Sequence, residues 1–402
     1  MPLVLVTILL PIAAGALLLV LPRAWTPLST GFVRLLGTAV AATTFFTLLA
    51  QGYGEWSFRW LSRPFLAAFH FGATPVSFWI ALLLAVCTAC AVAACRVPRL
   101  RDFIALMLVL EGTMLGLFLA RDLLVFALFW DLMLVPVFFA LIGWGEHPAT
   151  AWRYFIYNFA GGLTLLLATA AFGVIYGSTD VIGRSGAHFA GGWAAWIYAG
   201  FAFAFLVKTP IWPLHTWMPP TYSGLPSPMV AVVSAVQSKA GLYGFLAIAL
   251  ALVPQCVHQY AGPLMVLGAV SLIYGAVVAL VQNDAKRVVA YSSLSHLGLI
   301  AIAIASGNHL AIQGALVYIV AHGLFSAALF LVLGYLEERE DTRSLLRLGG
   351  LGWKNPRLAG ALCFAALAAL GLPGLAGFVG ELVILIGVYQ AGYVWPVIVA
   401  LV

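Results

Sequence analysis

Charged side chains are scarce in this sequence. Of its 402 residues only 8% are Asp, Glu, Lys or Arg, whereas a soluble globular domain carries about 25%. Hydrophobic residues make up 64% of the chain, and the mean hydropathy is +1.07. The polar surface that would face water on all sides is missing. The composition therefore excludes a cytosolic enzyme and a nucleic-acid-binding protein, despite a pI near 9.1, and predicts an integral membrane protein.

Motifs that bind redox cofactors, nucleotides or metals are also absent from the sequence. No G-x-G-x-x-G follows a strand, no P-loop occurs, and the five cysteines lack the spacing of iron–sulfur ligands. Cys87 and Cys90 form a C-x-x-C inside an apolar stretch, where we expect small packing residues. We expect no redox cofactor and no metal on this chain. The first apolar stretch lacks a positive amino-terminal region and a cleavage site, which predicts a membrane span and no cleaved signal.

Long apolar runs are the dominant feature of the chain. A helix needs roughly 20 apolar residues to cross about 30 Å of hydrocarbon. Only helices and closed barrels satisfy their backbone in lipid, and these runs lack the period-two alternation of a barrel. The predicted fold is an all-α integral membrane bundle of about 12 to 13 spans. The runs cover residues 2–22, 31–51, 76–95, 103–120, 122–143, 151–176, 193–217, 228–253, 262–282, 286–306, 310–336 and 357–389. The last 14 residues, YQAGYVWPVIVALV, are expected to form only part of a thirteenth helix.

The positive charges predict the orientation in the membrane. The loops after even-numbered runs hold only Arg59, Arg63, Arg121 and Arg184. Lys and Arg are enriched in cytoplasmic loops, so the loops after odd-numbered runs should be cytoplasmic and the N-terminus outside. Those odd-numbered loops, with the start of the second run, hold Arg23, Arg34, Arg96, Arg99, Arg101, Arg153, Lys286, Arg287, Arg339, Arg343, Arg347, Lys354 and Arg357.

A few ionisable residues lie inside the predicted spans. A charge at the bilayer centre costs roughly 2.5–3.5 kcal/mol on insertion scales, so each such residue suggests a function. A buried Lys loses its proton more readily unless a carboxylate is close, and His exchanges protons near neutral pH. The set therefore predicts a relay for protons or other cations, in which Asp131 and Lys208 could form an acid–Lys pair. Its members are Glu111, Asp131, Lys208, His215, Lys239, His296, His322 and Glu381.

Two of the predicted spans carry helix breakers beside a charge. Lys208 is followed by Pro210 and Pro213, and Gly371-Leu372-Pro373-Gly374 precedes Glu381. Broken helices in corresponding positions of two halves point to an inverted-repeat transporter and its ion site. We predict N-terminal helices over residues 1–100, a first five-helix repeat over 101–254 and a second repeat over 255–402.

Structural roles are the alternative for each of these residues. His215 could anchor the end of its span at the membrane interface, and Glu111 could pair with a neighbouring helix. Asp131, Lys208, Lys239 and Glu381 could form ion pairs without a transport function, although each would carry the insertion cost. The charges over residues 337–350 are expected to be a solvated connection. His70, His147, His188, His258 and His309 are expected to be ordinary exposed residues.

Five segments make the sequence resemble a known family. They are LLVFALFWDLMLVPVFFALIGWG, FAFLVKTPIWPLHTWMP, DAKRVVAYSSLSHLG, GALVYIVAHGLFSAALFLVLG and GLPGLAGFVGELVIL. In order and spacing they closely resemble the antiporter-like membrane subunits of the proton-pumping NADH:quinone oxidoreductase, respiratory complex I, over roughly residues 100 to 390. The acid at Glu381 resembles the M-type subunits, because the L and N types and the multi-subunit antiporters typically carry Lys there.

The resemblance implies a role for each intramembrane residue. Asp131 and Lys208 would be the acid–Lys pair of a first half-channel, although the family has Glu where this chain has the shorter Asp131. Lys239 would be the central Lys, His296 and His322 the relay of the second half, and Glu381 its terminal carrier. Glu111 resembles a further acid of the M type. The family has fourteen core spans, so this sequence lacks about two of them.

The resemblance also implies a function and partners. The chain would translocate H⁺, with Na⁺ as the alternative ion, in a bacterial cytoplasmic membrane. NADH, FMN, iron–sulfur clusters and quinone would be bound by partner subunits, with no cofactor and no nucleic acid on this chain. The alternatives are a subunit of a multi-subunit cation/proton antiporter, a subunit of a membrane-bound hydrogenase or formate hydrogenlyase, and an assembly scaffold that has lost its channel.

Overall fold

The computed structural model describes residues 2–21, 30–183, 189 and 191–401. Arg23, Arg184 and His188 of the sequence predictions lie outside this range. Within it, ten helices are long and apolar enough to cross a membrane. Three further apolar helices are shorter: Ala194–Lys208, Pro356–Ala369 and Ala376–Gln390. The predicted all-α membrane fold is confirmed, while the number of spans and the inverted repeats stay predictions.

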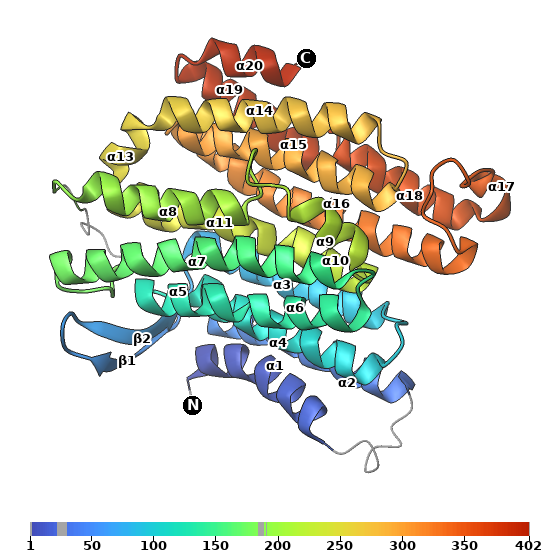
Figure 1. Ribbon diagram of the computed structural model, residues 1–402, viewed down its shortest axis with the longest axis horizontal. Helices are drawn as coiled ribbons and strands as arrows, with labels where there is room; N and C mark the ends of the chain where they lie inside the picture. The colour runs from blue at the N-terminus through green and yellow to red at the C-terminus, as the bar shows by residue number, and fades with distance from the viewer. Residues whose placement is uncertain (1, 22–29, 184–188, 190, 402) are drawn as a thin grey trace. The chain divides into compact units, whose positions relative to one another are not determined.

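The chain divides into two compact units, which are described separately. The first comprises residues 1–204 and 247–253, and the second residues 205–246 and 254–402. The first contains α1 (Leu3–Val20), α2 (Thr30–Gln51), α3 (Pro75–Ala93), α4 (Leu100–Leu119), α5 (Leu123–Leu132), α6 (Leu134–Trp144), α7 (Pro148–Tyr176) and most of α8 (Ala194–Lys208). In this unit α4 packs against α1, α3 and α5, and α7 packs against α5 and α6, as Figure 1 shows in blue to green.

The second unit is built around α15 and α16, which contact each other. Its first part contains the end of α8, α9 (Met218–Gly224), α10 (Ser227–Ala235), a 3₁₀ turn (Gln237–Lys239) and α11 (Ala240–Gly244). Its second part contains α13 (Pro254–Gln259), α14 (Ala261–Leu280), α15 (Ala285–Ala305), α16 (His309–Glu340), α17 (Leu351–Lys354), α18 (Pro356–Ala369), α19 (Ala376–Gln390) and α20 (Val394–Leu401). Helix α16, which carries His322, also packs against α10, α18 and α19; of its partners, α15 carries His296 and α19 carries Glu381.

Polar side chains start several of the helices. The Asp122 carboxylate accepts hydrogen bonds from the backbone N–H groups of Leu124 and Val125 and so caps α5. Asp284 caps α15 and Asn308 caps α16 in the same way. Each cap satisfies N–H groups that have no partner inside the helix, which fixes where the span begins.

A β-hairpin is the main element that the sequence prediction missed. Strands β1 (Glu55–Leu61) and β2 (Ala67–Gly72) pair antiparallel in the connection between α2 and α3. The segment EWSFRWL does alternate, since Trp56, Phe58 and Trp60 are separated by Ser57 and Arg59. Seven residues of alternation are easily hidden in a chain so rich in aromatic and aliphatic residues.

Four predicted spans are divided or irregular in the structure, two of them at the predicted breaks after Lys208 and over Gly371–Gly374. The run over 193–217 is helical only as far as Lys208 in α8, and the run over 357–389 is split into α18 and α19. The run over 228–253 matches a candidate span, Ser227–Leu252, whose helix is irregular. There α10 is followed by the 3₁₀ turn, α11, a π-helical stretch (Phe245–Ala249) and α12 (Leu250–Leu252). The run over 122–143 is also divided, into α5 and α6.

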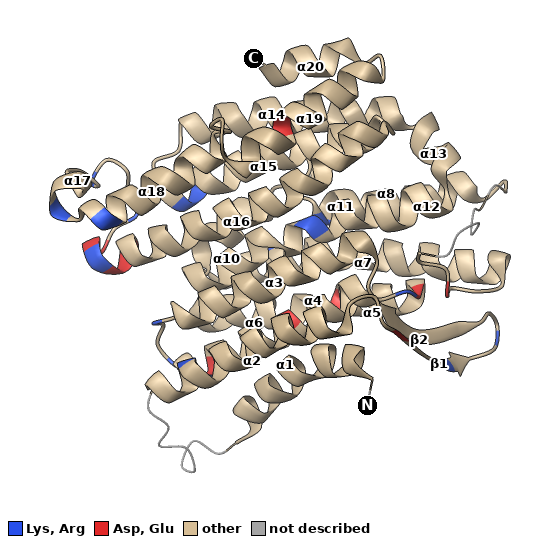
Figure 2. Ribbon diagram, turned by 180° about the vertical axis from the view of Figure 1, so that it is seen from behind, with Lys and Arg blue, Asp and Glu red and all other residues tan. Residues whose placement is uncertain are grey.

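Charged residues gather at the helix ends, as the coloured segments of Figure 2 show around α17, α18 and the end of α16. The prediction that residues 337–350 are simply a solvated connection is wrong in part. The buried Lys286 pairs with Glu337 at 2.7 Å, and Arg343 pairs with Asp284 at 2.7 Å. Lys286 also donates to the backbone carbonyl of Leu225 at 3.3 Å. These bonds tie the start of α15 to the end of α16, to the segment that follows α16 and to Leu225, the residue after α9.

Candidate functional site

The break after Lys208 is present at the predicted place. Helix α8 ends at Lys208, because Pro210 and Pro213 cannot donate the hydrogen bonds that would continue it. The Trp217 indole N–H donates to the freed carbonyl of Val207 at 2.9 Å. The Lys208 side chain is buried at the carbonyl end of the helix, where the helix dipole favours a positive charge.

Lys239 lies in a second break, which carries no proline. The fully buried Lys239 ends the 3₁₀ turn between α10 and α11. Its ammonium group donates to the Ser234 carbonyl, which also accepts a hydrogen bond from the Ser238 hydroxyl at 3.0 Å. Departures from the α-helix of this kind often mark functional sites. The irregular backbone supplies a carbonyl that holds a buried cation.

His296 and His322 come together on the facing helices α15 and α16. The centroids of their imidazole rings are 5.4 Å apart and the ring planes cross at 80°. The Lys239 charge is close enough to act on both rings. Within the described part of the chain, neither ring nitrogen of the buried His322 has a hydrogen-bond partner. The structure therefore brings three of the predicted relay residues into one cluster.

Glu381 is connected to this cluster by Tyr318, a residue that was not predicted from the sequence. The Tyr318 hydroxyl donates to the Glu381 Oε1 atom at 2.5 Å, and the Tyr318 ring is 5.8 Å from the His296 ring. On its other side Glu381 lies against Gly371, where an added Cβ would come within 2.2 Å of Oε2. The predicted break over Gly371–Gly374 is thus confirmed, and its first glycine makes room for the carboxylate.

Glu111 and Asp131 both belong to the first unit. Glu111 on α4 is fully buried, and its Oε1 atom accepts a hydrogen bond from the Thr44 hydroxyl at 2.6 Å. Asp131 near the end of α5 lies against α7, where a Cβ added to Gly162 would be 1.8 Å from the Asp131 Oδ1 atom. Lys208 belongs to the second unit, so its pairing with Asp131 stays a prediction.

His215 is buried among aromatic side chains of the second unit. Its ring centroid is 5.1 Å from that of Tyr274 and 6.4 Å from that of Tyr291. The sequence left its role open between an interfacial anchor and the relay. Its burial in the turn after α8 gives it packing partners within the protein.

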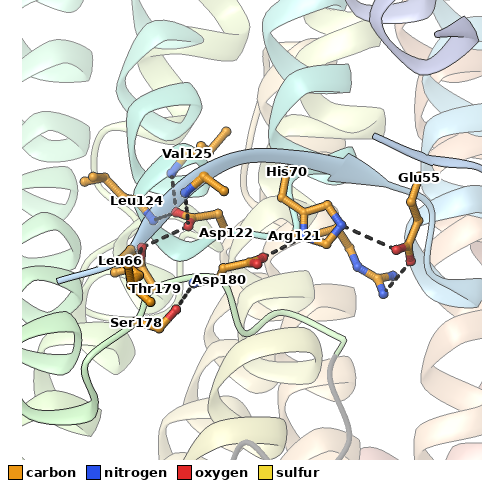
Figure 3. Close-up of polar contacts among 11 residues, drawn as sticks. Glu55, Leu66, His70, Arg121, Asp122, Leu124, Val125, Ser178, Thr179 and Asp180 are labelled. Carbon is orange, nitrogen blue, oxygen red and sulfur yellow. Dashed lines mark hydrogen bonds and ion pairs between the residues drawn. The ribbon is translucent and has the colours of Figure 1, made fainter. Parts of the chain in front are cut away.

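His70 was expected to be an ordinary exposed residue, and this expectation is wrong. The residue is only 7% exposed on β2, and its Nδ1 atom is 2.5 Å from Asp180 Oδ1. Its Nε2 atom is 3.4 Å from Glu55 Oε2, and Arg121 pairs with the same carboxylate at 2.8 Å. Figure 3 shows His70 between Asp180 and Glu55, beside Arg121. The group ties the hairpin to the connections that precede α5 and follow α7.

The β1–β2 hairpin should be more stable against local opening at low pH. The hydrogen bond to Asp180 raises the pKa of His70 above its ordinary value of 6.5, against the opposing effect of burial. The charged His70 therefore contributes stability fully below pH 6.5, and this contribution is lost as the pH rises through the raised pKa. Hydrogen exchange of the β1 and β2 amides, corrected for its intrinsic pH dependence, should become severalfold faster between about pH 6 and pH 9.

The matched variant for this prediction is His70→Asn, which keeps a polar side chain but does not titrate in this range. Its corrected exchange should be fast at both pH values. Equal protection of the wild-type hairpin at the two pH values would show that His70 does not stabilise it through its charge.

Comparisons with known proteins agree with one another. A family model described as "NADH:quinone oxidoreductase/Mrp antiporter, TM" matches residues 120–402. NADH-quinone oxidoreductase subunit M of Rhodobacter capsulatus is 31% identical over 95% of this chain and 79% of its own length. The protein of the same name from Escherichia coli K12 is 35% identical over 85% of this chain and 70% of its own length.

A solved structure matches over nearly the whole chain. The similar chain is part of respiratory complex I from Thermus thermophilus with bound NADH. The match has a TM-score of 0.88 and 32% sequence identity, and it covers 99% of this chain and 85% of that chain.

Proposed function

Because the chain belongs to the NADH:quinone oxidoreductase/Mrp antiporter transmembrane family, we propose that it translocates protons as a membrane subunit of an NADH:quinone oxidoreductase, of the subunit M or chain 4 type. The relatives named above and the similar chain of complex I support this assignment. The observation that carries it is the cluster of the buried Lys239 and His322 with His296, beside Glu381. These side chains can each hold or release a proton.

Electrostatics explain how such a cluster moves a proton in one direction. Lys239 acts electrostatically on both imidazoles, whose ring centroids are 5.4 Å apart, and neighbouring positive charges disfavour one another. A proton that arrives at one of the three therefore promotes release from another. Glu381 is the proton acceptor on the far side of the histidine pair. A carboxylate that is partly removed from water is stabilised when it takes up a proton.

The step before Lys239 involves Lys208 of the second unit and an acid predicted to act on it, Asp131 of the first unit. The buried Lys208 is positioned at the end of α8, and its proton occupancy depends on a nearby acid, for which Asp131 is the predicted partner. Quinone reduction elsewhere in the complex would change the charge or position of that acid. The proton would then pass from Lys208 to Lys239 and on to the histidines. Glu111, buried with Thr44, is a further proton-holding group of the first unit.

The environment of the chain is part of the proposal. NADH, FMN, iron–sulfur clusters and quinone are held by other membrane and peripheral subunits, and this chain carries no cofactor or metal of its own. The subunit lies in the lipid bilayer of a bacterial cytoplasmic membrane with its N-terminus outside, in keeping with its loop charges. The transported ion is H⁺, because His296 and His322 exchange protons and are poor ligands for Na⁺.

Replacement of Lys239 by methionine tests the proposal. The tagged chain is purified with its partners in mild detergent and reconstituted into liposomes, and the NADH:quinone reductase and proton-pumping rates are measured. The wild type should copurify with flavin and iron–sulfur subunits and pump protons. Lys239→Met should lower the pumping rate by roughly tenfold or more, because the relay loses its central proton carrier.

Lys354→Met is the matched control, since Lys354 is exposed and pairs only loosely with Glu340 at 3.8 Å. It should pump at the wild-type rate. Normal pumping by Lys239→Met would refute the role of the cluster. A purified assembly of other hydrophobic antiporter subunits, without reductase activity, would instead identify a cation/proton antiporter.

A further inference from the structure

Tyr318 connects the histidine pair to the terminal carboxylate. It lies on α16 four residues before His322, so both side chains project from the same face of the helix. The side chain is fully buried, its ring packs beside His296, and its hydroxyl donates to Glu381 at 2.5 Å. Tyr318 therefore contacts both the relay and its end.

The chemistry of the phenol suits a fixed donor. A tyrosine hydroxyl has an ordinary pKa near 10, so at neutral pH it keeps its proton and donates it to a neighbouring acceptor. Hydrogen bonds to a carboxylate are shorter and stronger than those between neutral groups. The bond to Glu381 is of this kind, and in this partly buried site it fixes the direction of the carboxylate.

The broken helix holds Glu381 from the other side. Gly371 has a φ of +67°, a conformation that residues with a side chain rarely adopt, and a Cβ there would meet Glu381 Oε2 at 2.2 Å. The carboxylate thus has one oxygen bonded to Tyr318 and the other against the backbone between α18 and α19. Two contacts from different elements leave it little freedom to turn.

We propose that Tyr318 is a positioning residue, whose hydroxyl holds the Glu381 carboxylate beside His296 so that the last acceptor receives its proton at a defined place. This inference rests on the proposed function. Proton transfer depends steeply on donor–acceptor distance, because a misplacement of about 1 Å can slow a reaction by about a hundredfold. A free carboxylate would meet the histidine pair in only a fraction of its orientations.

Tyr318→Phe in the assembled complex is the direct test. It removes the hydroxyl and keeps the ring that packs beside His296. The pumping rate should fall by roughly ten- to hundredfold. In infrared difference spectra, the C=O band of protonated Glu381, identified by its loss in Glu381→Gln, should move to higher wavenumber because the carboxyl loses a hydrogen bond.

Two further variants make the test decisive. Tyr389→Phe is the matched control, because Tyr389 lies on the same helix as Glu381 but is 61% exposed, and it should behave like the wild type. Tyr318→Gln supplies a different hydrogen-bond donor and should restore part of the pumping and of the band position. This rescue would not occur if Tyr318 served only to fill space, and it decides the matter even if Tyr318→Phe assembles poorly.

The outcomes separate this inference from the proposed function. If Tyr318→Phe pumps normally while Glu381→Gln does not, Tyr318 has no positioning role and the proposed function stands. If Tyr318→Gln restores the band but not the pumping, the positioning role is also wrong. If both Tyr318→Phe and Glu381→Gln pump normally, the proposed function itself fails.

Discussion

Replacing Gly241 by alanine is expected to lower both the amount of assembled subunit and its pumping rate by roughly tenfold or more. Gly241 is the second residue of α11 and packs directly against the end of α8. An added Cβ would lie 2.2 Å from the Phe205 carbonyl oxygen and 2.2 Å from the Thr209 hydroxyl oxygen. The carbonyl belongs to the helix backbone and cannot rotate away, so α11 or α8 must move.

Either movement affects a residue of the proposed relay. Lys239 precedes Gly241 by two residues, and Lys208 ends α8 within the same unit. Overpacking of a buried contact costs about 1–3 kcal/mol, which is enough to reduce assembly of a marginally stable protein. The close approach of these two helices thus serves both the fold and the site.

The amount of subunit in the membrane and the pumping rate of the purified complex measure this effect. Gly262→Ala in α14 is the matched control, because no atom lies within 4 Å of its added Cβ. It should be neutral or slightly stabilising, since alanine favours a helix. If the two variants behaved alike, the α8–α11 contact would not limit assembly or function.

The positions of the helices were predicted well from the sequence where the hydrocarbon of the bilayer alone determines them. A backbone in hydrocarbon must satisfy its own hydrogen bonds, so an apolar run of sufficient length becomes a helix. The run over 31–51 is thus α2, Thr30–Gln51, and the run over 103–120 is α4, Leu100–Leu119. The break after Lys208 was also predictable, because proline has a local steric effect.

The irregular backbone around Lys239 could not be predicted in this way. Residues 236–239 contain no proline or glycine, and the 3₁₀ turn depends on what packs around it. The hydrogen bond that Lys239 donates to the Ser234 carbonyl forms between the break and the helix just before it. A hydropathy pattern contains no information about them.

The candidate site was predictable in its charged members but not in its neutral ones. Glu381 and Lys239 were noticeable because a charge in a membrane is costly. Tyr318 carries no such signal, since tyrosine is common in membrane proteins and its role depends on the helix that faces it. Which residues meet across helices depends on the rotation of each helix about its axis. The misjudged His70 has the same cause, because its partners Asp180 and Glu55 are distant in sequence.

Replacing Gly162 by alanine is expected to slow proton pumping by roughly ten- to hundredfold while leaving assembly unchanged. A Cβ at this position of α7 would lie 1.8 Å from the Asp131 Oδ1 atom and 2.7 Å from its Cγ atom. Unlike the contact at Gly241, the obstructed group is the end of a side chain. Rotation of the carboxylate relieves the clash at little cost to folding, but it moves Asp131 away from its place.

The measurement compares pumping and assembly in Gly162→Ala with those in Gly360→Ala, whose added Cβ meets nothing within 4 Å. Asp131→Asn is a second comparison, because it removes the charge and keeps the shape of the side chain. We expect both Gly162→Ala and Asp131→Asn to assemble and to pump slowly. Normal pumping by Gly162→Ala would show that the position of the carboxylate does not matter to transport.

The double variant identifies the route by which Gly162 acts. If the alanine impairs transport only by displacing the Asp131 carboxylate, it should cause no further loss once Asp131 is Asn, because the charged carboxylate is then already absent. The pumping rate of Gly162→Ala/Asp131→Asn should then equal that of Asp131→Asn alone, a strong departure from additivity. Additive losses would mean that Gly162→Ala acts on another part of the unit, and the argument for a positioned Asp131 carboxylate would fail.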